Sequence, residues 1–109
     1  LAKKTLRDML VSDSPAATVD SIQKLVGNYY NLPVSKLKSK NNARQISFPR
    51  QVAMYLCKQL TRCSLPEIGR RFGGKHHSTV IHAVQKIERK RKEEPDFNRL
   101  VDGFIQSLQ

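Results

Sequence analysis

The sequence contains no tryptophan, only two cysteines and few acidic residues, and these shortages exclude several classes of protein. Cys57 and Cys63 are too few for the disulfide framework of a small secreted domain, so reduced cytosolic thiols are the simplest interpretation. No stretch approaches the roughly 20 consecutive apolar residues that a transmembrane helix needs. The N-terminus lacks the apolar run of a signal peptide. Because the chain begins with Leu1 rather than methionine, we expect it to be a piece of a longer protein.

What the sequence does contain is a large excess of positive charge. Twenty Lys and Arg stand against nine Asp and Glu, a formal net charge of +11. The excess lies in residues 36–94, which hold fifteen Lys and Arg and four Glu. A localised basic region attracts polyanions, most commonly DNA or RNA, and an anionic membrane surface is the main competitor. Since 39% of the residues are hydrophobic, a disordered basic tail is excluded.

The hydrophobic spacing is helical throughout, so the sequence predicts an all-α domain. A short amphipathic helix is expected over residues 1–11, followed by a break at 12–17. Thr18 is expected to cap a helix that ends near Tyr30, and a helical turn is expected at 34–37. Residues 38–45 are polar and aperiodic, which predicts a loop. Pro49 is expected to begin the next helix, which ends near residue 60, because its missing N–H is harmless in a first turn.

The most informative pattern lies between residues 64 and 92. Ser64 and Glu67 have the spacing of a capping box, which predicts a brief helix at 65–72. Gly73 and Gly74 predict a tight turn with positive φ angles, and a longer helix is expected from near His77 to about residue 92. This is the layout of a helix-turn-helix, whose second helix enters the DNA major groove. A last helix is expected at about 97–108.

An apolar stripe on the longer helix predicts which of its faces is buried. The stripe consists of Val80, Ala83, Val84 and Ile87. The opposite face and the helix entry carry polar or basic groups: Lys75, His76, His77, Ser78, Thr79, His82, Gln85, Lys86 and Arg89. Short or planar hydrogen-bonding groups at a helix N-terminus suit base edges, and the N-terminus itself favours phosphate. The basic run at residues 89–92 is expected to be a solvated helix end.

The run SLPEIGRRFGGKHHSTVIHA at residues 64–83 resembles the signature of the C-terminal DNA-binding domain of DnaA, the bacterial replication initiator. Residues 48–56 and 18–26 resemble the same family, so the resemblance covers residues 18–109. Residues 1–17 look like a connecting helix at the end of an ATPase module. The resemblance implies a Trp-repressor-like helix-turn-helix that binds a short, non-palindromic box at replication origins in the bacterial cytoplasm, at the nucleoid. This fragment would be a monomer without enzymatic activity.

The resemblance also implies properties of the longer parent protein. ATP and Mg²⁺ would bind in a module that this fragment lacks. The parent would assemble on origin DNA, and the helix at residues 1–11 would offer a contact for acidic phospholipids.

The same resemblance assigns DNA contacts to particular residues. Base contacts in the major groove fall to His76, His77, Ser78 and Thr79. Contacts in the minor groove fall to the basic loop, at Lys40, Asn42 and Arg44. Phosphate contacts fall to Arg50, Gln51, Lys58, Leu65, Pro66, Lys75 and His82. Two residues depart from the family's usual pattern, since His76 replaces an Asp and Asn42 replaces an Arg. These changes leave open the base preference at His76 and the strength of the minor-groove contact.

Other functions fit the sequence less well. Residues 69–75 resemble part of a P-loop, but His76 stands where a magnesium-binding Ser or Thr is required and no strand precedes it. The cysteines and histidines match no zinc-ligand spacing, so neither a metal site nor a catalytic site is expected. The chain lacks interleaved aromatic residues for stacking unpaired RNA bases. A helix-turn-helix transcriptional regulator and a module that binds anionic membrane surfaces remain the alternatives.

Overall fold

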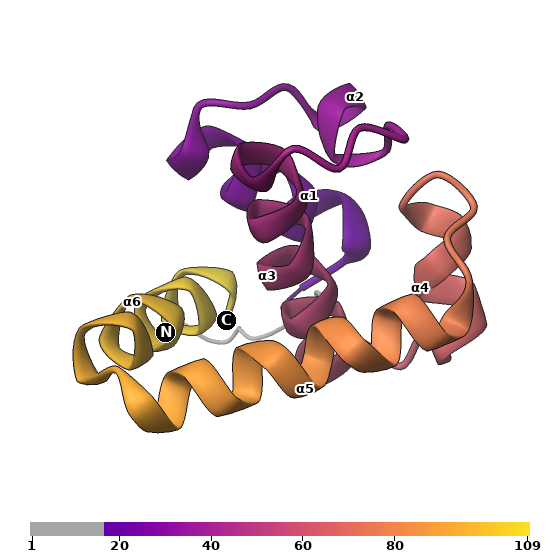
Figure 1. The fold of residues 1–109 in the computed structure, drawn as a ribbon. Coiled ribbons are helices and arrows are strands. Elements are labelled where there is room, and N and C mark those ends of the chain that lie inside the picture. The colour runs from indigo at the N-terminus through magenta and orange to yellow at the C-terminus, as the bar shows by residue number, and fades with distance from the viewer. Residues whose placement is uncertain (1–16) are drawn as a thin grey trace, which may run out of the picture.

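Six α-helices make up residues 17–109, the part of the chain that the computed structural model describes (Figure 1). They are α1 (Val19–Tyr30), α2 (Val34–Leu37), α3 (Arg44–Leu60), α4 (Leu65–Arg71), α5 (His77–Glu93) and α6 (Pro95–Leu108). No strand occurs in this part of the chain, so the predicted all-α fold class is confirmed. The helix expected at residues 1–11 lies outside the described residues, and none of the described helices is long and apolar enough to cross a membrane.

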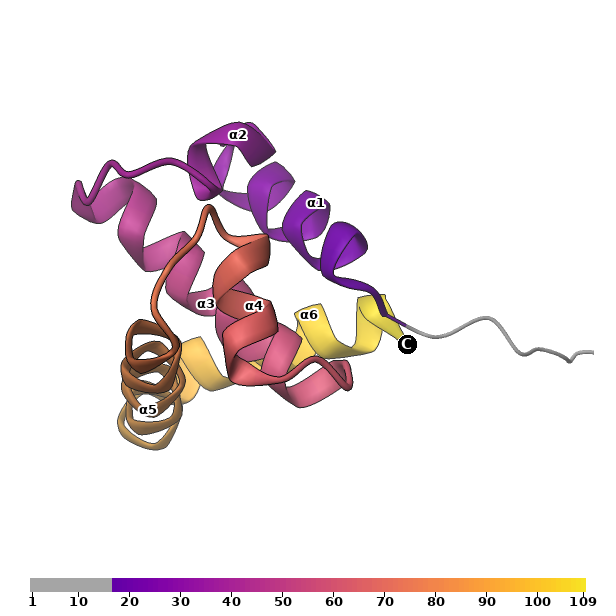
Figure 2. The same cartoon turned by 90° about the vertical axis from the view of Figure 1, so that its right-hand side faces the viewer.

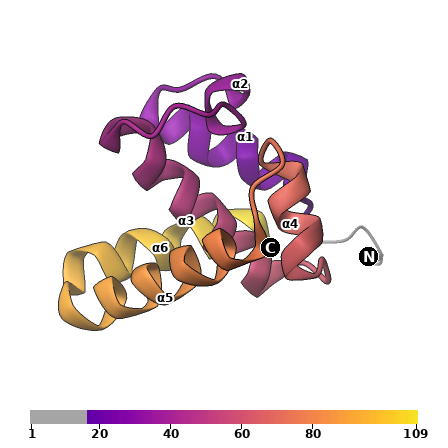
Figure 3. The same cartoon turned by 45° about the vertical axis from the view of Figure 1, so that its right-hand side comes forward.

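Helix α3 is the centre of the fold. It packs against α1, α2, α4 and α5, and Figures 1 and 3 show it standing between α1 and α2 on one side and the long α5 on the other. All six residues from Val52 to Cys57 are buried, because neighbours cover every side of these turns. Helix α6 lies alongside α5 and also touches α1 (Figure 3).

Helix α1 begins and ends where the sequence predicts. The Thr18 hydroxyl accepts a hydrogen bond from the Ser21 N–H, and the Ser21 hydroxyl accepts one from the Thr18 N–H, a reciprocal cap that stabilises the first turn. Asn31 ends the helix in the left-handed conformation, with φ of 60°. The buried Gln23 was not expected in the core. Its Nε2 donates to the Arg71 carbonyl at 2.9 Å and so joins α1 to α4.

The prediction that Pro49 begins the third helix was wrong, because α3 begins five residues earlier at Arg44. The Asn41 side chain accepts a hydrogen bond from the Ala43 N–H at 2.8 Å and so shapes the chain just ahead of the helix. The Ala43 carbonyl then accepts from the N–H groups of residues 46 and 47. Pro49 lies inside α3 and cannot supply the usual hydrogen bond to the Gln45 carbonyl. Polar residues across this first turn concealed it in the sequence.

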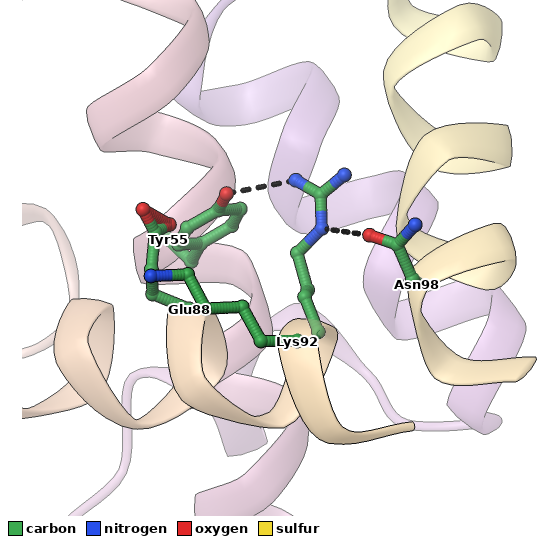
Figure 4. A pocket seen from close by; sticks show the side chains of 5 residues that line it. Tyr55, Glu88, Lys92 and Asn98 are labelled. Carbon is green, nitrogen blue, oxygen red and sulfur yellow. Dashed lines mark hydrogen bonds between the residues drawn. The ribbon is translucent and has the colours of Figure 1, made fainter. Parts of the chain in front are cut away.

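Arg91 fixes the C-terminal end of α5 to the rest of the fold, and Figure 4 labels two of its hydrogen-bonding partners, Tyr55 and Asn98. Its guanidinium donates to the Tyr55 hydroxyl of α3 at 2.8 Å and, on α6, to the side chains of Asn98 and Asp102. The expectation that residues 89–92 form a solvated helix end was therefore wrong for Arg91. The partners lie on other helices, and Tyr55 is 36 residues away in the sequence, so the pattern within α5 does not reveal them.

Candidate nucleic-acid interface

Helices α4 and α5 form the predicted helix-turn-helix. The Ser64 hydroxyl caps α4 by accepting from the Glu67 N–H at 3.3 Å, as predicted. The second half of the capping box was wrong, because the Glu67 carboxylate pairs with Arg70 instead of returning to the cap. At the end of α4 the Gly69 carbonyl accepts from the N–H groups of Gly74 and Lys75, at 3.1 and 2.9 Å, which folds the turn back onto the helix.

The two glycines of the turn adopt the positive φ angles that the sequence predicts. Gly73 has φ of 87° and Gly74 has φ of 79°. Gly73 also lies directly against the chain between α2 and α3, since a Cβ on it would come within 2.0 Å of the Lys38 carbonyl oxygen. Gly74 faces open space, because a Cβ on it would meet no atom within 4 Å. Figure 2 shows the turn reaching this chain segment. The turn therefore contacts α4 at Gly69 and the chain between α2 and α3 at Lys38.

The N-terminal turn of α5 presents polar side chains to solvent. His76 is the N-cap residue, and its Nδ1 accepts a hydrogen bond from the Ser78 N–H at 3.2 Å. His77 lies against it, with 4.3 Å between the ring centroids. Both histidines and Thr79 are exposed, while Ser78 is half-buried. Val80, Ala83 and Ile87 are buried and Val84 is half-buried, so the predicted core face of α5 is confirmed and its opposite face is free.

The cap determines which hydrogen-bonding group His76 offers to a ligand. A backbone N–H can only donate, so Nδ1 must carry no proton when it accepts from Ser78. The proton of the neutral imidazole then lies on Nε2. In this conformation the ring nitrogen that remains available is a donor, whereas a carboxylate at the same position would be an acceptor.

The basic loop predicted at residues 38–45 is shorter in the structure, because α3 begins at Arg44, and we call residues 38–43 the loop. Lys40 and Asn42 lie on it and are exposed. Arg44 is also exposed, but it is the first residue of α3 and not a loop residue. Within the loop the Ser39 hydroxyl donates to the Lys36 carbonyl at 2.7 Å, which continues the turn that follows α2.

Arg50 anchors the loop to α3. Its side chain is 4% exposed, and its guanidinium donates to three backbone carbonyls, those of Leu37 at 2.9 Å, Ser39 at 2.9 Å and Asn41 at 2.8 Å. A fourth, longer hydrogen bond of 3.4 Å reaches the Asn42 side chain. Burial lowers the pKa of the Arg50 guanidinium. No pattern in the sequence indicated this arrangement, and the phosphate contact assigned to Arg50 stays a prediction.

Lys75 also points toward the loop. Its Nζ donates to the Ser39 carbonyl at 2.8 Å and to the Phe72 carbonyl at 3.2 Å. Burial lowers the pKa of Lys75, and the neighbouring cations Arg50 and Lys40 lower it further. The phosphate contact assigned to Lys75 likewise stays a prediction.

Two adjoining clefts lie between the loop and α5. The first has a volume of about 360 Å³, and the second, between α3 and α5, about 210 Å³. Asn42, Arg50 and Thr79 line both. The other predicted site residues among the linings are Lys40, Lys75 and His76 in the first cleft and Gln51 and His82 in the second.

The remaining predicted site residues line neither cleft: His77, Ser78, Arg44, Lys58, Leu65 and Pro66. Gln51, which lines the second cleft, has a buried Oε1 with no hydrogen-bond partner among the described residues.

The cysteines and histidines do not form a metal centre in the described part of the chain, where no three His, Cys, Asp or Glu side chains gather around a point. Cys57 is buried in the core and is a free thiol. Burial raises its pKa to about 12, with a smaller contribution from the neighbouring Cys63. Such a thiol acts as a small apolar group rather than as a ligand or nucleophile.

Comparisons with known proteins agree with the fold and with the position of the helix-turn-helix. Residues 19–87 match the family described as "Bacterial dnaA protein helix-turn-helix". The chromosomal replication initiator protein DnaA of Magnetococcus marinus is 50% identical over 95 residues, which cover 87% of this chain and 21% of that protein. DnaA of Geobacter sulfurreducens is 43% identical over 108 residues, which cover 99% of this chain and 24% of that protein.

A solved structure shows the same architecture. The crystal structure of a DNA replication initiation factor superposes with a TM-score of 0.75 at 36% identity, and the match covers 83% of this chain and 27% of that one. The chain thus spans about a fifth to a quarter of the length of the curated relatives that it matches.

Proposed function

The chain belongs to the family of helix-turn-helix domains of the bacterial DnaA protein, the DNA-binding part of a replication initiator, and we propose that it binds one asymmetric duplex box through both grooves. The supporting observation is the junction of two polar segments. The exposed entry of α5 and the loop meet at the clefts lined by Asn42 and Thr79. A helix N-terminus fits the major groove, and a basic loop at a fixed distance from it can reach the adjacent minor groove.

The proposed contacts divide into base readers and phosphate anchors. His76, His77, Ser78 and Thr79 read base edges in the major groove, while Lys40, Asn42 and Arg44 enter the minor groove. Phosphates are held by Gln51, Lys58, His82 and the N-terminus of α4 at Leu65 and Pro66. These anchors lie on three different helices, so they fix the orientation of α5 on the duplex. Arg50 and Lys75 carry the same assignment by resemblance.

The cap on α5 refines the base preference that the sequence left open. Because Nδ1 of His76 accepts from Ser78, the ring presents an Nε2–H donor to the groove. Guanine offers N7 and O6 as acceptors there, whereas the cytosine amino group is a donor and has nothing to meet on this ring. We therefore expect a guanine, or another acceptor edge, opposite His76.

Selection of bound duplexes from a random pool, repeated at two salt concentrations, tests the proposal. We expect one asymmetric consensus at both salts, with an acceptor edge at the position whose preference changes in His76→Asp. Competing RNA and vesicles of anionic lipid should displace the selected box poorly. A pool that yields no consensus, or equal competition by RNA or by vesicles, would contradict sequence-specific DNA binding.

The properties of the longer protein are part of the same proposal. Since the relatives are about four times as long as this chain, ATP and Mg²⁺ binding, self-assembly at origins and initiation itself fall to the segments outside it. The fragment binds its box as a monomer, because an asymmetric site needs no second copy. It has no catalytic role. Residues 1–17 connect to the preceding module, and residues 1–11 provide the acidic-phospholipid contact.

A further inference from the structure

We propose that Arg50 and Lys75 are positioning residues that clip the loop to the turn between α4 and α5, so that the two groove-reading segments form one preorganised body. We call this pair the clip. The proposal rests on the proposed DNA-binding function. It goes beyond that function because it gives both residues a role in place of the phosphate contacts that the resemblance implies.

The clip converges on a single backbone atom. Arg50 Nη2 and Lys75 Nζ both donate to the Ser39 carbonyl oxygen, at 2.9 and 2.8 Å, although Arg50 lies on α3 and Lys75 lies in the turn. Lys75 also holds the Phe72 carbonyl, directly ahead of the glycine turn. Arg50 holds the carbonyls of Leu37 and Asn41, one on each side of Ser39. Arg50 therefore ties two loop carbonyls and the last residue of α2 to α3, and Lys75 ties one loop carbonyl to the turn.

The turn and the loop also touch directly. Gly73 lies so close to Lys38 that a Cβ on the glycine would come within 2.0 Å of the carbonyl oxygen and 2.9 Å of the carbonyl carbon. Backbone cannot yield as the end of a flexible side chain can. The contact therefore fixes the distance between the chain that precedes α5 and the chain that precedes α3.

The geometry of Arg50 leaves little for a phosphate. Its four hydrogen bonds all go to acceptors between residues 37 and 42, and only 4% of the side chain is exposed. A guanidinium can satisfy acceptors in several directions because its donors lie in a rigid plane, whereas an ammonium is a single point. Lysine at this position keeps the charge but cannot hold three carbonyls and a side-chain amide in the same arrangement.

Preorganisation explains why such a clip matters for recognition. A flexible loop of six residues would lose conformational entropy each time it entered the minor groove, and this cost would weaken specific binding. The clip moves that cost to folding, because the loop is already held before DNA arrives. Its loss should therefore affect sequence reading by the loop more than general attraction to DNA.

The substitution Arg50→Lys tests the clip, with Arg99→Lys as the matched control, because Arg99 is exposed on α6 and belongs to no proposed DNA contact. We expect Arg50→Lys to weaken binding of the selected box by about tenfold or more, while Arg99→Lys stays within about twofold of wild type. The loss should arise at the base pairs under the loop, where Arg50→Lys should tolerate changes that wild type rejects. Binding to random duplex should be unchanged, because the charge is retained. Arg50→Lys binding the box as wild type does, with unchanged preferences, would overturn the proposal.

Hydrogen exchange in the DNA-free protein provides a readout that does not depend on DNA. Arg50→Lys should speed exchange at the loop amides, such as those of Asn41 and Ala43, and leave the amides of α5 protected. Unchanged protection of the loop would refute the clip even if DNA binding were weaker. If wild type itself shows no preferred box while exchange behaves as expected, the proposed function fails and the clip survives as a structural device.

Two glycine variants test the clip without changing any charge. Gly73→Ala and Gly74→Ala impose similar backbone strain, since both glycines have positive φ, but only the first drives a methyl group into Lys38. After correction for stability, Gly73→Ala should lose discrimination at the loop's base pairs and Gly74→Ala should keep it. Equal discrimination by the two folded variants would contradict a fixed loop-to-turn distance. This pair also decides the question if Arg50→Lys does not fold.

Discussion

The two ends of α5 carry similar polar and basic side chains but use them in opposite ways. At the N-terminal end, His77 and Thr79 are exposed above the glycine turn. At the C-terminal end, Arg91 donates to side chains of α3 and α6, and Lys90 lies over the rings of Phe48 and Phe97 at 5.5 and 5.4 Å from their centroids. One end is open to a ligand and the other is committed to the fold.

The difference shows that the location of a charge does not by itself identify a binding residue. The C-terminal end has the higher density of cations, yet the charge of Arg91 is matched by Asp102 and that of Lys90 by Glu94. The N-terminal end has fewer cations but offers hydrogen-bonding groups that the fold leaves free. What decides between structure and recognition is whether partners lie within reach in the folded chain.

Arg91→Ala should remove the contacts that hold the C-terminal end of α5 to α3 and α6, and it should have the largest effect on stability. It removes hydrogen bonds to three side chains and leaves the buried Tyr55 hydroxyl without its partner, so we expect unfolding to become easier by about 2–4 kcal/mol. Urea denaturation measures this change. The neighbouring Arg89→Ala, at an exposed position, should stay within about 0.5 kcal/mol of wild type. If Arg91→Ala were as stable as Arg89→Ala, the two ends would not differ as described.

His77→Ala should weaken DNA binding by the N-terminal end of α5 without destabilising the fold. The side chain is exposed, so its loss should leave the midpoint of urea denaturation near that of wild type. Binding to the selected box should weaken by about 1–3 kcal/mol, and binding to random duplex should change little. Fluorescence anisotropy with the two duplexes measures both. Equal losses on both duplexes would remove His77 from the set of base readers.

Lys58→Ala extends the comparison from α5 to an exposed cation on another helix, α3. Lys58 is exposed near the end of α3 and has no hydrogen bond or ion pair with another described residue. As a phosphate anchor it should weaken all duplexes alike and reduce the slope of log K against log salt by about one unit. Titrations at several salt concentrations provide the slope. A slope equal to that of wild type would show that Lys58 does not touch the DNA backbone.

Local patterns predicted much of the fold because they record local physics. The cap at Thr18, the positive φ angles at Gly73 and Gly74, and the core face of α5 all depend on residues close together in the chain. The start of α3 was missed because Pro49 is a strong signal for a first turn, while the true first turn is polar. Tertiary contacts that bury Ile46 and Pro49 override such signals.

The sequence predicted the polar side chains that surround the entry of α5, but not the contacts that some of them make within the fold. The exposed entry of α5 follows from the helix-turn-helix pattern and from periodicity. The inward-facing Arg50 does not, because its partners are backbone carbonyls of residues 37–41, which no side-chain pattern encodes. The capping role of His76 was equally hidden, since histidine is not among the residues preferred at that position. Contacts to backbone atoms are the part of a site that one sequence reveals least.

The smallest effect on stability is expected at alkaline pH, where Tyr30 titrates within the aromatic cluster at the C-terminal end of α5. Tyr30 lies against Phe48, which in turn packs on Phe97 near Lys90. Burial, with a smaller contribution from Tyr29, raises the pKa of Tyr30 from 10.0 to about 12. The folded state then keeps a proton that the unfolded chain releases, so this stabilisation is complete below pH 10 and is lost as pH rises toward 12.

Tyr30→Phe removes this titration and should make the alkaline decline of stability shallower, while leaving stability at pH 7 close to that of wild type. Urea midpoints at pH 7, 10 and 11 measure the difference. Part of the decline should persist in the variant, because the Cys57 thiol has a pKa raised to about 12 and destabilises the fold in the same direction as pH rises above 9.0. Identical alkaline declines in Tyr30→Phe and wild type would show that the hydroxyl is solvated, and the aromatic cluster at this end of α5 would then be more open than its contacts indicate.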